Sequence, residues 1–102
     1  MQLDPISILI VDDEESIRIV LSEILTNTGY HCAVSPDAVQ GIEYLKTHAV
    51  DLIISDIVLP QMHGTEFARV IRQMSPDTET ILITGLPDTA TAIDGIRSAE
   101  GY

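Results

Sequence analysis

The sequence contains two short apolar runs that each end in aspartate, ILIVDD at residues 8–13 and LIISD at residues 52–56. Continuous β-branched runs of this length are typical of strands that are buried on both faces of a parallel sheet. The carboxyl ends of parallel strands meet at one edge of a sheet, where open α/β sheets bind their ligands. If the two runs are neighbouring strands, Asp12, Asp13 and Asp56 therefore line one crevice at that edge.

Three adjacent carboxylates repel one another, and the repulsion raises their pKa values unless a cation joins them. Oxygen ligands alone suit a hard cation such as Mg²⁺, which keeps several waters and takes one or two protein carboxylates. We therefore predict a Mg²⁺ site at Asp12, Asp13 and Asp56, with one carboxylate left over for chemistry. Asp12 and Asp13 taken alone could instead cap a following helix. The position of Asp56 at a second strand end favours the metal site.

Strand-like and helix-like segments alternate through the chain. The pattern predicts strands at residues 7–11, 31–35, 51–55 and 80–84, and helices at 15–28, 37–48, 65–74 and from a cap at Asp88 or Thr89 to about residue 98. This alternation predicts a parallel sheet with right-handed crossovers and helices on both faces.

The aspartates constrain the strand order, because they meet only if the first and third strands are neighbours. The flavodoxin-like order 2-1-3-4 satisfies this condition. We therefore predict an α/β fold in which a doubly wound parallel sheet lies inside a three-layer α/β/α arrangement. Thr84, which ends the fourth predicted strand, would then lie beside Asp56, where its hydroxyl could hydrogen-bond a bound anion.

The composition of the chain excludes several classes of function. The 102 residues fit one domain, and 16 acidic residues against 5 basic ones give a formal net charge of −11. Nucleic-acid binding and membrane-surface binding both need clustered Lys and Arg, so neither is expected. The sequence has no apolar run that could span a bilayer and no signal peptide. Cys32 is the single cysteine and cannot form an internal disulfide, so we expect a cytoplasmic domain.

These motifs, in this order and at this spacing, resemble the receiver domain of two-component response regulators. The resemblance covers nearly the whole chain. It rests on two aspartate-bearing strand ends, a turn and a threonine-bearing strand end, which are Asp12-Asp13, Asp56, LPQMHG at residues 59–64, and Thr84-Gly85.

The resemblance implies a role for each of these positions. Asp56 would accept a phosphoryl group from a histidine kinase or a phosphotransfer protein. Asp13 would bind Mg²⁺ directly, Asp12 would act through water, and the backbone carbonyl of Val58 would complete the protein ligands. Thr84 would hydrogen-bond the phosphoryl group and shift toward it on activation. The next residue is a glycine, Gly85, and its missing side chain leaves room for that group to enter.

One part of the family pattern is missing from the sequence. The family carries a Lys-Pro pair at the end of a fifth strand and a fifth helix after it, whereas this sequence ends at Tyr102, which matches the aromatic switch position. Lys46, the only lysine, lies on the second predicted helix and is poorly placed to substitute, so no catalytic lysine is expected. We expect residues 1–102 to be a receiver domain that is incomplete at the C-terminus, by truncation rather than by loss of the element.

The missing helix has a structural consequence in this interpretation. One sheet face would lose part of its apolar cover, and the fourth strand would become an unpaired edge. We therefore expect a chain that is marginal as a monomer, or that dimerises through the uncovered sheet face or the last helix. Any output domain would lie beyond residue 102.

The leading hypothesis is a regulatory phosphoacceptor domain rather than an enzyme. Phosphorylation of Asp56 would change the loop and helix after Thr84 and so alter a partner surface. One alternative is a pseudo-receiver, which binds proteins without phosphorylation and is favoured by the missing lysine. A less favoured alternative is an aspartyl-phosphate phosphatase of the haloacid-dehalogenase type, whose D-x-D pattern Asp12-Asp13 does not match.

Overall fold

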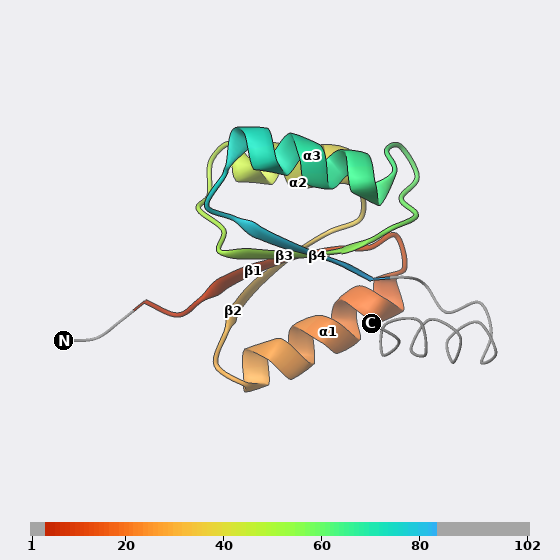
Figure 1. Cartoon of the computed structure of the whole chain (residues 1–102). Helices are drawn as coiled ribbons and strands as arrows, with labels where there is room; N and C mark the ends of the chain where they lie inside the picture. Colours follow the sequence, from red (N-terminus) through yellow and green to blue (C-terminus); the bar gives the residue numbers. More distant parts are fainter. Residues whose placement is uncertain (1–3, 84–102) are drawn as a thin grey trace, which may run out of the picture.

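The computed structural model describes residues 4–83, which form four strands and three helices in strict alternation (Figure 1). The elements are β1 (Ser7–Val11), α1 (Glu15–Asn27), β2 (His31–Ser35), α2 (Ala38–Leu45), β3 (Leu52–Asp56), α3 (Gly64–Met74) and β4 (Glu79–Ile83). The helix expected near residues 88–98 lies outside the described residues.

All strand pairs are parallel, and the sheet order is β2-β1-β3-β4. The predicted order 2-1-3-4 is therefore confirmed. Helices α2 and α3 lie together on one face of the sheet, and α1 lies on the other, which gives three layers (Figure 1). Strands β1 and β3 occupy the centre, so the two predicted aspartate-bearing ends are adjacent.

The element boundaries differ from the predicted ones by small shifts with local causes. Helix α2 begins at Ala38 because Asp37 is its N-cap, with a side chain that accepts a hydrogen bond from the Gln40 N–H at 2.8 Å. It ends at Leu45 rather than at residue 48. Strand β3 begins one residue later than predicted, because Asp51 instead accepts a hydrogen bond from the Ser7 N–H. Asp56 is consequently the last residue of β3.

The main hydrophobic core lies between the sheet and the α2–α3 layer. Its buried side chains are Leu9, Val11, Ala38, Val50, Ile53, Leu59, Phe67 and Ile71. Gly41 lets α2 approach α3 closely, since a Cβ there would lie 3.2 Å from the Phe67 ring and 3.4 Å from Val11. A glycine inside a helix costs stability relative to alanine, and at this position it permits the close packing of α2.

Helix α1 is much less covered than α3. None of its residues is buried, and its apolar residues Val20 and Ile24 are 51% and 55% exposed. Among the described residues α1 is the only helix on its side of the sheet (Figure 1). Within residues 4–83 no helix has the length and apolar character needed to cross a membrane.

Candidate functional site

Asp12, Asp13 and Asp56 converge at the carboxyl ends of β1 and β3. Each offers a carboxylate oxygen, and these oxygens all lie within 4.8 Å of one another. The register pairs Val11 with Ser55, so the residues after this pair are brought side by side. The proximity expected from the two strand ends is therefore present, whereas the role of each carboxylate as a ligand stays a prediction.

The spacing of the three carboxylates fits one hard divalent cation. Ligand oxygens of an octahedral Mg²⁺ ion lie about 3.0 Å apart when adjacent and about 4.2 Å apart when opposite, because each Mg–O bond measures about 2.1 Å. The three oxygens lie within 4.8 Å of one another, so rotation of the side chains toward a shared ion can bring them to these distances. The cluster contains only oxygen donors, so it could bind Mg²⁺.

Asp12 is the most firmly held member of the cluster. Its side chain is buried, its N–H donates to the Ser35 carbonyl at 3.1 Å, and its Oδ1 accepts from the Glu14 N–H at 2.9 Å. The N-cap position of α1 belongs to Glu14, which makes no side-chain capping bond. Asp12 thus fixes the turn that leads into α1. Neither Asp12 nor Asp13 is the N-cap residue, so the alternative that they cap this helix is wrong.

Burial and repulsion both act on Asp12. Burial is the largest cause that raises the pKa of its carboxyl above the ordinary value, and the charges of Asp56, Asp13 and Glu14 add to it. The hydrogen bond from the Glu14 N–H opposes the rise but does not cancel it. A cation shared by the carboxylates would relieve the same repulsion.

Asp56 is oriented by the residues that follow it. Its side chain is buried, and its Oδ1 accepts a hydrogen bond from the Val58 N–H at 3.2 Å. The sequence-based prediction assigned only the carbonyl of Val58, so the contribution of this amide was missed. The side chain of Val58 is 69% exposed, which leaves the rim of the site open on that side.

Gly64 closes the loop after Asp56. Its N–H donates to the Ile57 carbonyl at 2.6 Å, and α3 begins at this residue. A Cβ at Gly64 would lie 2.6 Å from the Asp56 carbonyl oxygen and 2.7 Å from the Ile57 Cα. Only glycine permits this approach of two main-chain segments. Gly64, which the sequence placed in the turn, is therefore required for the position of the Asp56 backbone.

Arg18 also contacts the site, although the sequence analysis did not single it out. Its Nη1 donates a hydrogen bond to the backbone carbonyl of Asp12 at 2.7 Å. Helical side chains tilt toward the helix N-terminus, so an arginine in the first turns of α1 can reach back to the end of β1. That directional rule is the signal that could have identified it.

Three predicted site residues cannot be placed. Thr84, Gly85 and Tyr102 lie outside the described residues, and their roles stay predictions. The end of β4 is nevertheless close to the carboxylates, because Ile83 is the register partner of Asp56 and its carbonyl accepts a hydrogen bond from the Ile57 N–H at 2.9 Å.

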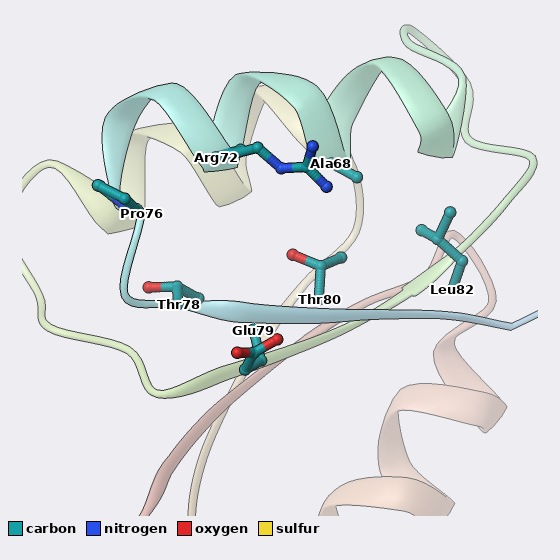
Figure 2. A pocket seen from close by; sticks show the side chains of 7 residues that line it. All are labelled: Ala68, Arg72, Pro76, Thr78, Glu79, Thr80 and Leu82. Carbon is teal, nitrogen blue, oxygen red and sulfur yellow. The ribbon is translucent and has the colours of Figure 1, made fainter.

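A separate pocket of about 490 Å³ lies between α3 and β4 (Figure 2). Thr80 and Leu82 point from β4 toward α3, and the side chain of Arg72 extends along α3 above them, whereas Glu79 points to the other face of the sheet (Figure 2). None of the three aspartates lines this pocket. It is therefore distinct from the carboxylate cluster.

Comparisons with known proteins agree with this arrangement. Residues 8–101 match the family described as the response regulator receiver domain. The response regulator ArlR of Staphylococcus aureus is 37% identical over 96 residues, which are 93% of this chain and 43% of ArlR. The chain spans less than half the length of the curated relatives that it matches first.

Solved structures show the same fold. A signal receiver domain of an HD domain-containing protein from Pseudomonas fluorescens Pf-5 superposes with a TM-score of 0.78 at 36% identity, over 95% of this chain and 78% of that one. The response regulator TrrA from Thermotoga maritima, solved in complex with Mg²⁺-BeF, gives a TM-score of 0.75 at 34% identity, over 80% of this chain and 71% of that one.

Proposed function

Because the chain belongs to the response regulator receiver domain family, we propose that it is a phosphoacceptor domain in which Asp56 receives a phosphoryl group from a histidine kinase or phosphotransfer protein. The observation that supports this most directly is the cluster of Asp12, Asp13 and Asp56, whose oxygens lie within 4.8 Å of one another. Asp56 ends a central strand of the sheet, where ligands of such folds bind.

The environment of Asp56 suits a nucleophile. The Val58 N–H donates to Oδ1 at 3.2 Å and so restrains the orientation of the carboxylate, and we assign Oδ2 as the attacking atom. A new P–O bond to Oδ2 would form as the P–N bond to the donor histidine breaks, and the histidine nitrogen would leave with that electron pair. In-line transfer of this kind depends mainly on positioning and charge compensation.

Mg²⁺ is the cofactor that the donor set suits best. Bound at the cluster, it would offset the repulsion between the carboxylate and the incoming phosphoryl oxygens. We assign direct coordination to Asp13 and Asp56, a water-mediated contact to Asp12, and the remaining protein ligand to the Val58 carbonyl. Thr84 would hydrogen-bond the transferred group, and Gly85 would leave room for it. Tyr102 would act as the aromatic switch residue.

The proposal extends to the surroundings of the domain. We propose a regulatory role rather than turnover of a substrate, a cytoplasmic location, and an output domain beyond residue 102. The longer curated relatives, of which the chain covers 22–43%, support an output domain. The net charge of −11 supports a segment that does not itself bind nucleic acid or a membrane.

A pseudo-receiver that binds partners without phosphorylation is the second candidate. One observation favours it: Lys46, the only lysine of the sequence, pairs with Glu43 on α2 at 2.8 Å. It is therefore engaged away from the carboxylates and does not supply a phosphate-binding cation.

Reaction with acetyl phosphate separates the two candidates. The 102-residue chain is incubated with acetyl phosphate and Mg²⁺, and intact mass and ¹⁵N-HSQC spectra are recorded, with Asp56→Asn as the control. Phosphoacceptor function predicts a one-phosphoryl adduct and shifts near Val58 in the wild type only. No adduct, and no shifts with beryllofluoride, would instead support the pseudo-receiver.

A further inference from the structure

Arg18 makes an unexpected contact with the main chain of the carboxylate cluster. It lies on α1, six residues after Asp12, and it is half-buried. Its Nη1 donates to the Asp12 carbonyl oxygen at 2.7 Å, a distance typical of a strong hydrogen bond from a charged donor. The contact therefore fixes a backbone atom at the end of β1 and does not involve an acidic side chain.

The contact completes the hydrogen bonding of Asp12. The N–H of Asp12 donates to Ser35, and its Oδ1 accepts from the Glu14 N–H. Its carbonyl lies beyond the last β1–β2 register pair, Val11 with Ser35, so it has left the sheet ladder. Within residues 4–83 this carbonyl accepts its hydrogen bond from Arg18.

Asp13 depends on the same peptide unit but has less support. Its side chain is exposed, and within residues 4–83 its carboxylate accepts no hydrogen bond that would orient it. The peptide that joins Asp12 to Asp13 is planar, so fixing its carbonyl oxygen also fixes its amide nitrogen and constrains the Asp13 Cα. Arg18 thereby restricts the directions in which the Asp13 side chain can leave the backbone.

We propose that Arg18 is a positioning residue of the metal site, which holds the Asp12–Asp13 peptide and so aims the Asp13 carboxylate at the cation. This inference rests on the proposed function, because it assumes that Asp13 binds Mg²⁺. It adds to that function a residue outside the ligand set on which metal affinity depends. Mutation of residues that orient metal ligands typically costs about 10- to 100-fold in metal affinity or activity.

The role of Arg18 is geometric rather than a matter of neutralising charge. Within the described residues the guanidinium donates to a main-chain carbonyl and forms no ion pair with a carboxylate. The other basic residues of the described chain lie elsewhere: Lys46 pairs with Glu43 on α2, and Arg69 and Arg72 are exposed on α3. Shape and hydrogen bonding of the guanidinium therefore matter more than its charge alone.

Magnesium titrations of three variants test this inference. Arg18→Met removes the donor at similar length, Arg18→Lys keeps the charge but not the planar fork, and Arg69→Met makes the same charge change at an exposed position. We expect the Kd for Mg²⁺ to rise about tenfold in Arg18→Met and by less in Arg18→Lys. We expect it to stay within about twofold of the wild type in Arg69→Met, since changes of exposed charge have small effects.

A metal-free NMR measurement gives an independent readout. Loss of the hydrogen bond should move the Asp12 ¹³C′ and Asp13 ¹⁵N resonances in Arg18→Met and leave them unchanged in Arg69→Met, in the presence of EDTA. The rest of the spectrum shows that the variant is folded. If Arg18→Met does not fold, the same two resonances and the Kd are measured in Arg18→Lys, where both should move in the same direction by a smaller amount.

The outcomes separate this inference from the proposed function. Wild-type binding of Mg²⁺ that Asp13→Asn abolishes, together with unchanged affinity in both Arg18 variants, would overturn the role of Arg18 alone. A wild-type chain with no Mg²⁺ binding would overturn the metal site and this inference with it. Weaker binding in the Arg18 variants, with the two resonances shifted, supports both.

Discussion

At the scale of single residues, the loop after Asp56 depends on a position that has no space for a side chain. We predict that Gly64→Ala lowers the free energy of unfolding by about 1–3 kcal/mol, the usual cost of forcing extra atoms into a packed site. The added methyl would lie 2.6 Å from the Asp56 carbonyl oxygen, and this atom belongs to backbone that cannot move alone. Urea denaturation measures the loss.

Gly41→Ala provides the matched control. Its Cβ would lie 3.2 Å from the Phe67 ring, which is a side chain that can shift slightly, so we expect a smaller loss of stability. Beryllofluoride binding should weaken in Gly64→Ala, because the Val58 N–H moves with the loop, and stay near the wild-type value in Gly41→Ala. Equal stability and equal binding in the two variants would contradict the prediction.

Asp12 gives the metal-free chain a specific dependence on pH. Burial and neighbouring charges raise its pKa above the ordinary value of 3.8, so the folded chain binds more protons than the unfolded chain between the two pKa values. The free energy of unfolding should therefore fall as the pH rises from 3.8 through the folded-state pKa. Urea denaturation in EDTA across this range measures the effect.

Asp12→Asn tests the assignment of that pH dependence. The amide oxygen can still accept the Glu14 N–H, but the residue no longer titrates. We expect the variant to lose this part of the pH dependence and, in EDTA, to be more stable than the wild type at neutral pH. A variant with an unchanged pH profile would show that Asp12 does not cause it.

The residues of the site differ in how far the sequence could predict them. Asp12, Asp13 and Asp56 could be predicted because each ends an apolar run, and the order of a parallel sheet then brings them together. The Arg18 contact and the Val58 amide could not, because neither follows a period: each hydrogen bond depends on how one turn folds back. Sequence patterns locate strand ends but not the path of the chain after them.

At the scale of the elements, strands were easier to predict than helix ends. Strands β1 and β2 begin and end as expected, and β3 and β4 shift by one residue, because a buried apolar run leaves little choice of boundary. Helix α2 ends three residues early, in a turn where the Lys46 and Thr47 N–H groups donate to the carbonyls of Glu43 and Tyr44. These two bonds span three residues, and only the His48 N–H, which donates to the Tyr44 carbonyl at 3.0 Å, keeps the four-residue spacing of an α-helix. The boundary of a helix is poorly defined in such a turn.

Helix α1 presents exposed apolar side chains, and we predict that they cause self-association. Val20 and Ile24 are 51% and 55% exposed, and burying them between two copies would be favourable. Ile24→Lys should weaken a dimer about tenfold or more, because a buried unpaired charge costs well over 1 kcal/mol. Sedimentation velocity across the micromolar range measures the change.

Met74→Lys is the control for that experiment. Met74 is 40% exposed at the end of α3, on the opposite side of the sheet. We expect this variant to associate like the wild type. A wild-type chain that sediments as a folded monomer at every concentration would refute the prediction, and so would equal effects of the two lysines.

At the scale of the whole molecule, bound Mg²⁺ should stabilise the fold. A ligand that binds only the folded state at one hundred times its Kd adds about 2.7 kcal/mol to the free energy of unfolding. The unfolded chain separates the two strand ends and cannot reproduce the cluster. Asp13→Asn should remove most of this gain, and thermal or urea unfolding with and without Mg²⁺ measures it.

Screening of the net charge of −11 is the competing explanation for any gain from Mg²⁺. Asp77→Asn makes the same charge change at an exposed residue after α3, and it should keep the full stabilisation. Sodium chloride at equal ionic strength should give little of it. Equal gains in Asp13→Asn and Asp77→Asn would show that the effect is general screening and not site binding.

The Ile57 N–H donates to the Ile83 carbonyl at 2.9 Å, directly after Asp56 and at the end of β4. A conformational change at Asp56 would therefore be transmitted to the C-terminal end of β4 through one residue and one hydrogen bond. This coupling runs along the edge of the sheet formed by the strand ends, so it does not require the hydrophobic core to rearrange.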